Sequence, residues 1–327
     1  MLVLGIESTA HTFAAAVLNE SGVILSDVRN SYRAPSGSGI HPREASRHHA
    51  DVAPHVIKEA IEKSGISIKD IDAIAYSAGP GLGPCLRVGA IVARTLASYY
   101  SKPLTPVNHA VGHIELASLL TSSKDPICIL VSGGHTAIVA FSQGRWRFFG
   151  ETLDITIGQL FDQFGRYVGL SSPCGPVIEE LASKGTKYIQ VPYTVKGNDM
   201  SFSGTLTHSK RLLKSYTLED VAFSLQETAF AMLCETAERA LAFTEKDELL
   251  VAGGVAANKR LAEMLEAVCK RQGARLYIPP IKYSGDCGPQ IAWTGIRQIQ
   301  AGITIRPEDA FVRQSWRLDQ VITPWRY

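Results

Sequence analysis

Two histidines four residues apart are the side chains with the clearest potential for chemistry in this sequence. His109 and His113 stand in an apolar stretch. Its residues Ala110, Ile114 and Ala117 recur at helical spacing, which predicts a helix. On a helix the two imidazoles project from one face, and their nitrogens can chelate one divalent cation. Taken alone, however, the pair is read more simply as two partly buried or surface histidines.

Asp286 provides a third candidate ligand for such a cation. It lies in the glycine-flanked loop 283–288, whose composition does not suit mere packing. Two imidazoles and one carboxylate leave coordination positions open for a substrate or a phosphate. The chain has no H-E-x-x-H motif, so it lacks the glutamate base that a metalloprotease carries on its histidine helix. His109, His113 and Asp286 therefore predict a three-ligand metal site.

Two Gly-Gly loops have the composition of a nucleotide site. The segment 132–136, Ser-Gly-Gly-His-Thr, joins two apolar runs, and Gly253-Gly254 joins a buried-strand pattern to a helical one. Glycine lets backbone N–H groups approach phosphate oxygens closely, and hydroxyl groups add donors. The second loop can also place an adenosine beside a helix N-terminus. Each Gly-Gly pair alone is typical of a tight turn, but the two together indicate a nucleotide.

The elements that must hold these loops form an internal repeat. In each copy an apolar strand leads through Ser-x-x-His-Thr into a second strand, and a glycine-containing turn then leads into a third. The shared motif occupies residues 8–12 in the first copy and 132–136 in the second. We interpret the repeat as a duplication rather than a chance likeness of two hairpins. The predicted strands are 3–7, 13–18 and 23–27, and then 127–131, 137–141 and 145–149.

Helical patterns between and after the two copies predict sheets that are covered by helices. Helix 45–61 stops at Gly65, and Pro54 is expected to kink or divide it. Two lobes that each begin with a three-stranded meander describe an α/β protein of the actin-like ATPase (ASKHA) fold, with a nucleotide-binding cleft. The other predicted helices are 220–243 and 258–272, which alternate with strands at 71–77, 249–252 and 275–278.

The chain is expected to divide into these two lobes near residue 125. At 327 residues it has the length for two lobes of ordinary domain size. Lobe I would comprise residues 1–124, and lobe II would comprise residues 125–294. The C-terminal segment 295–327 is expected to complete lobe I by packing back on it as a long helix.

Composition and charge indicate a globular protein of the cytosol. The net charge of +2 neither indicates nor excludes a nucleic-acid partner. None of the six cysteines stands in a C-x-x-C pair, which favours free thiols in a reducing compartment. The sequence does not begin with a signal-peptide pattern, and no apolar run approaches the roughly 20 residues of a membrane span. We therefore expect a soluble cytoplasmic protein with no membrane partner.

Two basic clusters have the composition of phosphate contacts for RNA. Such clusters are most often solvated surface, and aromatic residues for base stacking are not interleaved with either of them in the sequence. Neither cluster therefore predicts a base-reading site. Their members are Arg29, Arg33, Arg43 and Arg47 in one, and Lys210, Arg211 and Lys214 in the other.

Several short motifs stand in a characteristic order along the chain. They are G-P-G-L-G-P at 79–84, L-R-V-G at 86–89, the histidine pair, S-G-G-H-T at 132–136, S-F-S-G at 201–204, G-G-V-A-A-N at 253–258 and the Asp286 loop. In this order they resemble the universal tRNA threonylcarbamoyladenosine transferase family, from the first strand to about Gly302. The segments 197–204 and 223–230 are most similar to the archaeal and eukaryotic branch, whose members are catalytic subunits of the KEOPS complex.

The resemblance implies an acyl transfer to tRNA. An unstable threonylcarbamoyl-adenylate, made by another enzyme, would bind in the cleft. Its threonylcarbamoyl group would pass to the exocyclic amine of the adenosine beside the anticodon, and AMP would leave. His109, His113 and Asp286 would hold a divalent metal ion, with iron favoured over zinc, and no residue is assigned as general base. The residues implied to line the adenine nucleotide or adenylate are Leu130, Val131, Ser132, Gly133, Gly134, Asp162, Gly175, Glu179 and Asn258.

Two departures from the family pattern bear on the metal. Leu130 stands where archaeal relatives often carry a tyrosine ligand, and leucine cannot coordinate a cation. Cys287-Gly288-Pro289 replaces the commoner asparagine and alanine types beside Asp286. The resemblance therefore implies three protein ligands, which would suit iron or zinc.

The resemblance also implies partners. These are tRNA and the other KEOPS subunits, namely a protein kinase, a small dimerising subunit and a kinase-binding subunit. We expect helix 45–61 to be the docking surface for the dimerising subunit.

Other classes of function stay open at this point. A small-molecule kinase of the same fold needs a carboxylate base near its acceptor, and it gives the histidine pair no role. A metalloprotease, the older glycoprotease assignment, fits a bare histidine pair but lacks the glutamate base. A scaffold that only regulates the associated kinase would need no metal.

Overall fold

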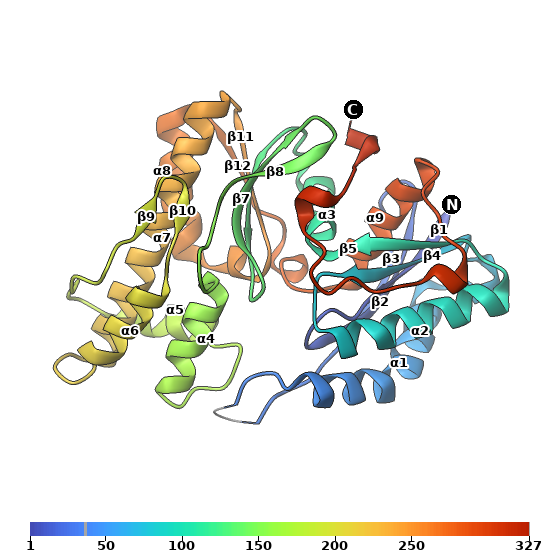
Figure 1. Cartoon of the computed structure of the whole chain (residues 1–327), viewed down its shortest axis with the longest axis horizontal. Helices are drawn as coiled ribbons and strands as arrows, with labels where there is room; N and C mark the ends of the chain where they lie inside the picture. Colours follow the sequence, from blue (N-terminus) through green and yellow to red (C-terminus); the bar gives the residue numbers. More distant parts are fainter. Residues whose placement is uncertain (36–37, 327) are drawn as a thin grey trace.

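The computed structural model describes residues 1–35 and 38–326, and its main strands form two five-stranded sheets (Figure 1). In the first sheet the strand order is β3-β2-β1-β4-β5. Strands β1, β2 and β3 form an antiparallel meander, and β4 and β5 continue from β1 in parallel. The strands are β1 Leu2–Glu7, β2 Thr12–Asn19, β3 Ile24–Ser31, β4 Ala73–Gly79 and β5 Leu104–Asn108.

The second sheet repeats the topology of the first. Its order is β12-β11-β6-β7-β8, in which β6, β7 and β8 form the meander and β11 and β12 continue from β6 in parallel. The predicted duplication and the two-lobed architecture are thereby confirmed. The strands are β6 Ile127–Val131, β7 Thr136–Ser142, β8 Arg145–Glu151, β11 Glu248–Ala252 and β12 Arg275–Tyr277, and a small hairpin joins β9 Val195–Lys196 to β10 Asp199–Met200.

Both faces of the first sheet are covered by helices, so strand β1 is buried almost throughout. Side chains alternate along a strand; Leu4 and Ile6 belong to the core under α1 and α2, whereas Val3 packs with α9. Gly5 allows α9 to lie close to the strand, because a Cβ atom there would stand 2.3 Å from the backbone nitrogen of Ala292. These helices are α1 Pro42–Ser64, α2 Gly83–Tyr100 and α9 Gly288–Gln300.

The second sheet is covered by α3 on one face and by the remaining helices on the other. Helix α3 follows strand β5 of the first sheet but packs on the second, and α9 follows β12 but packs on the first. The two helices also contact each other. Because they cross over in this way, the lobe boundaries given by the sequence stay a prediction. The helices are α3 His109–Thr121, α4 Ile157–Tyr167, α5 Gly175–Lys184, α6 Ser203–Leu212, α7 Leu218–Thr244 and α8 Lys259–Gln272.

Two predictions about helices are changed by the structure. Pro54 does not divide α1, which runs unbroken from Pro42 to Ser64. The prediction of a long C-terminal helix is wrong, because the described residues after α9 form only the short 3-10 turns Pro307–Asp309, Leu318–Gln320 and Pro324–Arg326. The last long helix is α9 itself, which ends just before Gly302, a residue with a φ of 75°.

All six cysteines are buried free thiols, as the sequence predicted. In the part of the chain that the structure describes, no helix combines the length and the apolar character of a membrane span.

Candidate metal centre

Helix α3 starts at the first of the two histidines because Asn108 caps it. The Asn108 Oδ1 atom accepts hydrogen bonds from the backbone N–H groups of Ala110, at 3.0 Å, and Val111, at 3.1 Å. Its Nδ2 atom donates to the backbone oxygen of Trp316. The predicted histidine helix is confirmed, and it lies between the two sheets (Figure 1).

The structure brings the three predicted ligands together. Asp286 Oδ1 lies 3.4 Å from His109 Nε2 and 3.3 Å from His113 Nε2. One ligand atom from each residue lies within 4.8 Å of the others, so the three need only a small adjustment to meet around one shared ion at about 2.1 Å. The His113 Nε2 atom is buried and forms no hydrogen bond with any described residue. A buried imidazole nitrogen that faces a carboxylate without a hydrogen bond to it fits a metal ligand.

Glu7 fixes the orientation of the first histidine. Its Oε2 atom lies 2.9 Å from His109 Nδ1, and its Oε1 atom accepts hydrogen bonds from the backbone and hydroxyl groups of Thr9. Gln290 Nε2 lies 3.0 Å from the same histidine nitrogen. With Nδ1–H donated to Glu7, the Nε2 lone pair of His109 is left for a cation. Glu7 was not identified from the sequence, because a single carboxylate at the end of an apolar strand gives no signal until the sheet order is known.

In the absence of a cation, the charges of this cluster favour an ionised Asp286 and a protonated His109. Burial alone would raise the pKa of Asp286, but His109 and His113 hold the pKa of this carboxyl well below its usual range. Burial lowers the pKa of His113. At His109 the effect of burial is outweighed by Glu7 and Asp286, and the pKa rises to about 9. A cation that binds His109 Nε2 therefore displaces a proton in neutral solution.

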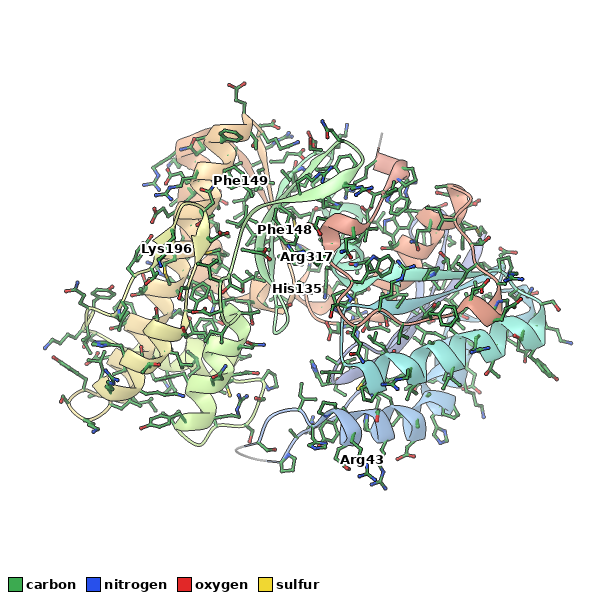
Figure 2. The ribbon with its side chains drawn as sticks, in the orientation of Figure 1. Arg43, His135, Phe148, Phe149, Lys196 and Arg317 are labelled. Carbon is green, nitrogen blue, oxygen red and sulfur yellow. The ribbon has the colours of Figure 1, made fainter. Side chains whose placement is uncertain are left out.

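The Gly-Gly loop after β6 lies beside the cluster. Ser132 Oγ accepts hydrogen bonds from the N–H groups of Gly134 and His135, which holds the loop in shape. His135 is largely buried; burial, followed by the charges of the two cluster histidines, lowers its pKa to about 3. Figure 2 shows His135 at the centre of the molecule, between the two lobes. A Cβ atom on Gly133 would meet nothing within 4 Å, so its backbone faces open space.

The other predicted nucleotide residues gather where helices α4, α5 and α8 begin or meet. Asp162 accepts a hydrogen bond from the backbone just before α5, at 2.7 Å. Glu179 accepts one from the first N–H group of α8, at 2.8 Å. Asn258 caps α8, and Gly175 faces open space. Both carboxylates therefore have structural hydrogen bonds, and their contact with a nucleotide stays a prediction.

Leu130 and Val131 present their side chains to opposite hydrophobic clusters. Leu130 packs with residues of α3, and Val131 packs with the core under α4 and α7. Any contact of Val131 with a nucleotide must therefore be made by its backbone. The burial of Leu130 agrees with its inability to act as a metal ligand.

Aromatic residues absent from the sequence neighbourhood of one basic cluster lie beside it in space. Lys210 lies over the ring of Tyr167, 5.1 Å from its centroid. In the same lobe, Lys187 lies over the ring of Tyr216, 5.4 Å from its centroid. Tyr167 is 59% exposed. The structure thus adds an aromatic neighbour that the sequence does not show, and the prediction that this cluster is not a base-reading site stays a prediction.

Solved structures share the overall fold at low sequence identity. HypF from T. kodakarensis superposes on 92% of this chain, and on 48% of its own, with a TM-score of 0.64 and 14% identity. Component A of the (R)-2-hydroxyglutaryl-CoA dehydratase of Acidaminococcus fermentans does so on 92% of this chain and 99% of its own, with a TM-score of 0.57 and 14% identity. The predicted actin-like ATPase fold is confirmed.

Sequence comparisons cover nearly the whole chain. The family model described as tRNA N6-adenosine threonylcarbamoyltransferase matches residues 23–293. A protein of that name from Thermofilum pendens is 50% identical over 99% of this chain and 97% of its own, and one from Caldivirga maquilingensis is 48% identical over 99% and 98%. A probable bifunctional tRNA threonylcarbamoyladenosine biosynthesis protein from Methanothermobacter thermautotrophicus is 48% identical over 99% of this chain and 61% of its own. The chain belongs to the tRNA N6-adenosine threonylcarbamoyltransferase family.

Proposed function

We propose that the protein transfers a threonylcarbamoyl group from threonylcarbamoyl-adenylate to the exocyclic amine of the adenosine beside the tRNA anticodon. The amine nitrogen forms a bond to the carbamoyl carbon, and the bond between that carbon and the phosphate oxygen breaks. AMP leaves with the bonding electron pair, and the amine loses one proton. Family membership supports this reaction. The observation that carries it is the His109–His113–Asp286 cluster beside the Gly-Gly loop.

The cluster residues fit a resident divalent cation. His109, His113 and Asp286 would hold it, and the family resemblance favours iron over zinc, although two nitrogens and one oxygen suit both. When bound, the ion supplies Lewis-acid polarisation of an oxygen of the donor. Glu7 keeps the His109 ring in the tautomer that leaves Nε2 free.

The Gly-Gly loop is proposed to hold the phosphate of the donor. The N–H group of Gly134 is already bonded within the loop. The N–H group of Gly133 has no partner among the described residues, and this residue is exposed. A preorganised N–H donor stabilises the negative charge that AMP carries away.

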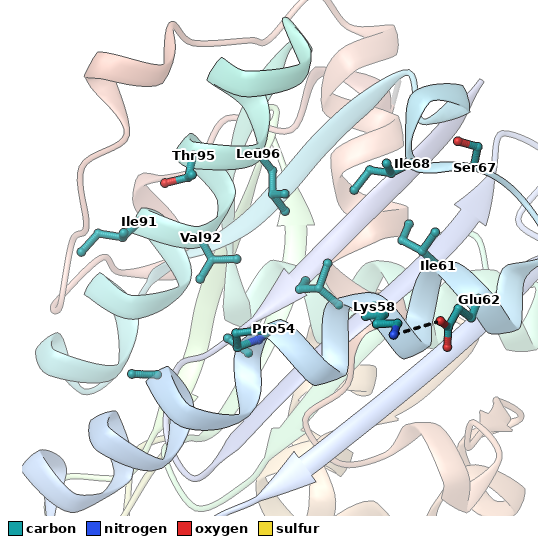
Figure 3. A pocket seen from close by; sticks show the side chains of 13 residues that line it. Pro54, Lys58, Ile61, Glu62, Ser67, Ile68, Ile91, Val92, Thr95 and Leu96 are labelled. Carbon is teal, nitrogen blue, oxygen red and sulfur yellow. Dashed lines mark ion pairs between the residues drawn. The ribbon is translucent and has the colours of Figure 1, made fainter.

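An apolar groove on lobe I is proposed to dock the small dimerising subunit of a KEOPS complex. The groove has a volume of about 670 Å³ and lies between α1 and α2 (Figure 3). Ile91 on its wall is 59% exposed, which is unusual for a large apolar side chain without a partner. Ile91→Asp is expected to abolish co-purification with that subunit. Undiminished co-purification would contradict the proposed surface.

The substrate, tRNA, would place the reaction in the cytoplasm.

The metal site is tested by pairing metal content with transfer activity. We expect the wild-type protein to hold about one metal ion per chain and to modify tRNA with its partner proteins present. His109→Ala and Asp286→Ala are expected to lose both properties while keeping the fold by circular dichroism. His55→Ala, which replaces an exposed histidine on α1, is the matched control and should keep both. Normal modification by both cluster variants would refute the site, and turnover of ATP with a soluble acceptor would favour a kinase.

A further inference from the structure

A second cavity lies at the seam between lobe II and the C-terminal segment. Its volume is about 230 Å³. Strands β7 and β8 form one side of it, and residues 315–318 form the other. Figure 2 shows Phe148, Arg317 and His135 following one another along this seam. The residues on which the argument depends are His135, Phe148, Glu151, Ser315, Trp316 and Arg317.

None of the three metal-cluster residues lines this cavity, but His135 lies between the cavity and the cluster. His135 lines the cavity, and its ring lies within electrostatic reach of His109, His113 and Asp286. Leu130 also lines it and packs in the same hydrophobic cluster as residues of the histidine helix. A group held in the cavity would therefore present one edge to the place where the donor reacts.

The volume of the cavity suits a single ring system rather than a whole nucleotide. Pockets that enclose complete small-molecule ligands measure about 300–1,000 Å³, so 230 Å³ accommodates a smaller fragment. Phe148 and Trp316 contribute aromatic surface, and Leu130, Ala137 and Leu318 contribute apolar surface. Such walls suit a flat heteroaromatic ring.

The charges around the cavity disfavour an anionic group. Arg317 is the arginine on its wall, and its guanidinium is neutralised by Glu151 at 3.1 Å and Asp319 at 3.4 Å. It also lies over the ring of Phe148, 4.6 Å from the centroid. Among the described residues that line the cavity, no arginine or lysine is left unpaired for a carboxylate such as that of the threonyl group.

We propose that this cavity receives the acceptor adenine after it has been turned out of the anticodon loop. An enzyme that acts on a base atom must take that base out of its stack, and the base needs a pocket beside the reacting donor. The cavity offers one, with His135 at the end where the exocyclic amine would meet the donor. This assignment rests on the proposed transferase function, and it adds the acceptor site to it.

The assignment is tested by filling the cavity from its rim. Ser315 lines the cavity and is exposed, so Ser315→Trp adds bulk there with little demand on the core. Gln320→Trp adds the same bulk to an exposed position on the same segment, outside the cavity, and is the matched control. Phe148→Ala removes a stacking surface instead, and is expected to weaken acceptor binding roughly fivefold to 150-fold.

Two measurements are made on the assembled complex with each variant. One is single-turnover transfer from preformed threonylcarbamoyl-adenylate to tRNA. The other is the affinity for threonylcarbamoyl-adenylate and for AMP. We expect Ser315→Trp to lose transfer while both affinities stay at the wild-type level, and Gln320→Trp to match the wild type throughout.

The possible outcomes separate the two proposals. If the wild type transfers nothing, the proposed function fails. If the wild type is active and Ser315→Trp and Phe148→Ala transfer as fast as Gln320→Trp, the acceptor pocket is wrong. If Ser315→Trp binds threonylcarbamoyl-adenylate poorly but AMP normally, the cavity belongs to the threonyl group of the donor, and the assignment is overturned.

Discussion

Glu7 acts on the metal cluster through His109 without being placed as a ligand itself. It accepts the Nδ1–H hydrogen bond at 2.9 Å, and this bond makes the opposite ring nitrogen a better donor to a cation. We expect Glu7→Gln to lower the affinity for the metal by about 10- to 100-fold, because the amide accepts more weakly and carries no charge. A titration against a competing chelator measures this.

The control for that variant is Glu59→Gln, which makes the same change at an exposed position on α1. Circular dichroism reports whether either protein has lost its fold. Equal metal affinities for the two variants would show that Glu7 has no positioning role.

The sequence contained enough to find the ligands but not the residue that orients them. The spacing of His109 and His113 places both on one helical face, and the glycine-flanked loop marks Asp286. Glu7 lies 102 residues before His109 in the chain. Only the pairing of β1 with β4, and of β4 with β5, brings the ends of these strands together. A single carboxylate gives no such information until the sheet order is known.

At the scale of elements, the end of α6 forms a basic and aromatic surface suited to RNA. Lys210 lies over Tyr167, and neither Lys210 nor Lys214 forms an ion pair with a described residue. Cations beside exposed rings can contact phosphates and stacked bases. We expect Lys210→Ala and Lys214→Ala each to weaken tRNA binding. Each should also reduce the slope of log affinity against log salt by about 1.

The control for the RNA surface is Lys63→Ala, which removes a lysine that pairs with Glu59 on α1. Filter binding at several salt concentrations compares the three variants. A salt slope unchanged from the wild type in both the Lys210 and the Lys214 variant would exclude this surface as a phosphate contact.

Asp154 joins the strand β8 region to the start of α6. It accepts hydrogen bonds from the backbone N–H groups of Phe202, at 2.8 Å, and Ser203, at 3.1 Å. The hydroxyl groups of Ser201 and Ser203 add to these and outweigh partial burial, so the pKa of Asp154 lies well below its ordinary 3.8. A carboxyl whose pKa is lower in the folded than in the unfolded protein stabilises the fold at pH values above its unfolded pKa. This stabilisation is lost as the pH falls towards the folded pKa.

We therefore expect Asp154→Asn to be less stable than the wild type at pH 7. The difference in the free energy of unfolding should shrink as the pH falls below about 4. Urea unfolding at pH 7, 4 and 3 measures it. A difference that stays constant over this range would mean that the charge of Asp154 does not contribute.

Strands were easier to predict than the C-terminal segment. The β1 and β6 patterns are short, apolar and bounded by turns, so their existence and direction followed from the sequence. A long helix was predicted for the C-terminal residues. Instead, α9 ends before Gly302, and Pro307 and Pro324 stand in the segment that follows. Likewise Tyr167 and Lys210 are far apart in the chain, and only the packing of α4 on α6 brings them together.

The whole molecule is a duplication whose two copies have diverged at equivalent loops. The loop after β1 follows Glu7, which orients the metal cluster. The loop after β6 carries Gly133-Gly134, which leaves backbone open to a ligand. Helices α3 and α9 then cross to the opposite sheets. This exchange places His109 at the start of one helix and Asp286 just before the other, so the site exists only when both lobes are folded.

The C-terminal segment links the two lobes along their seam. The backbone N–H group of Arg313 donates to the oxygen of Ala78 in the first sheet, and that of Thr323 donates to the oxygen of Gly144 in the hairpin between β7 and β8. The segment then reaches α3, where Arg326 Nε lies 2.5 Å from Glu115 Oε1. Its guanidinium also donates to Ser118 Oγ at 2.8 Å.

The pair of Arg326 and Glu115 is buried, with exposed side-chain fractions of 9% and 6%. Arg326→Met is expected to cost about 3–5 kcal/mol of stability, because it leaves a buried carboxylate unpaired. Replacing both partners, Arg326→Met with Glu115→Leu, should recover most of that loss, since no unpaired charge remains. Denaturant unfolding followed by tryptophan fluorescence measures both variants. If the double variant is no more stable than Arg326→Met, the charge pair is not what holds the segment to the histidine helix. Glu115 lies two residues beyond His113. We therefore expect metal affinity to fall in Arg326→Met and to recover in the double variant.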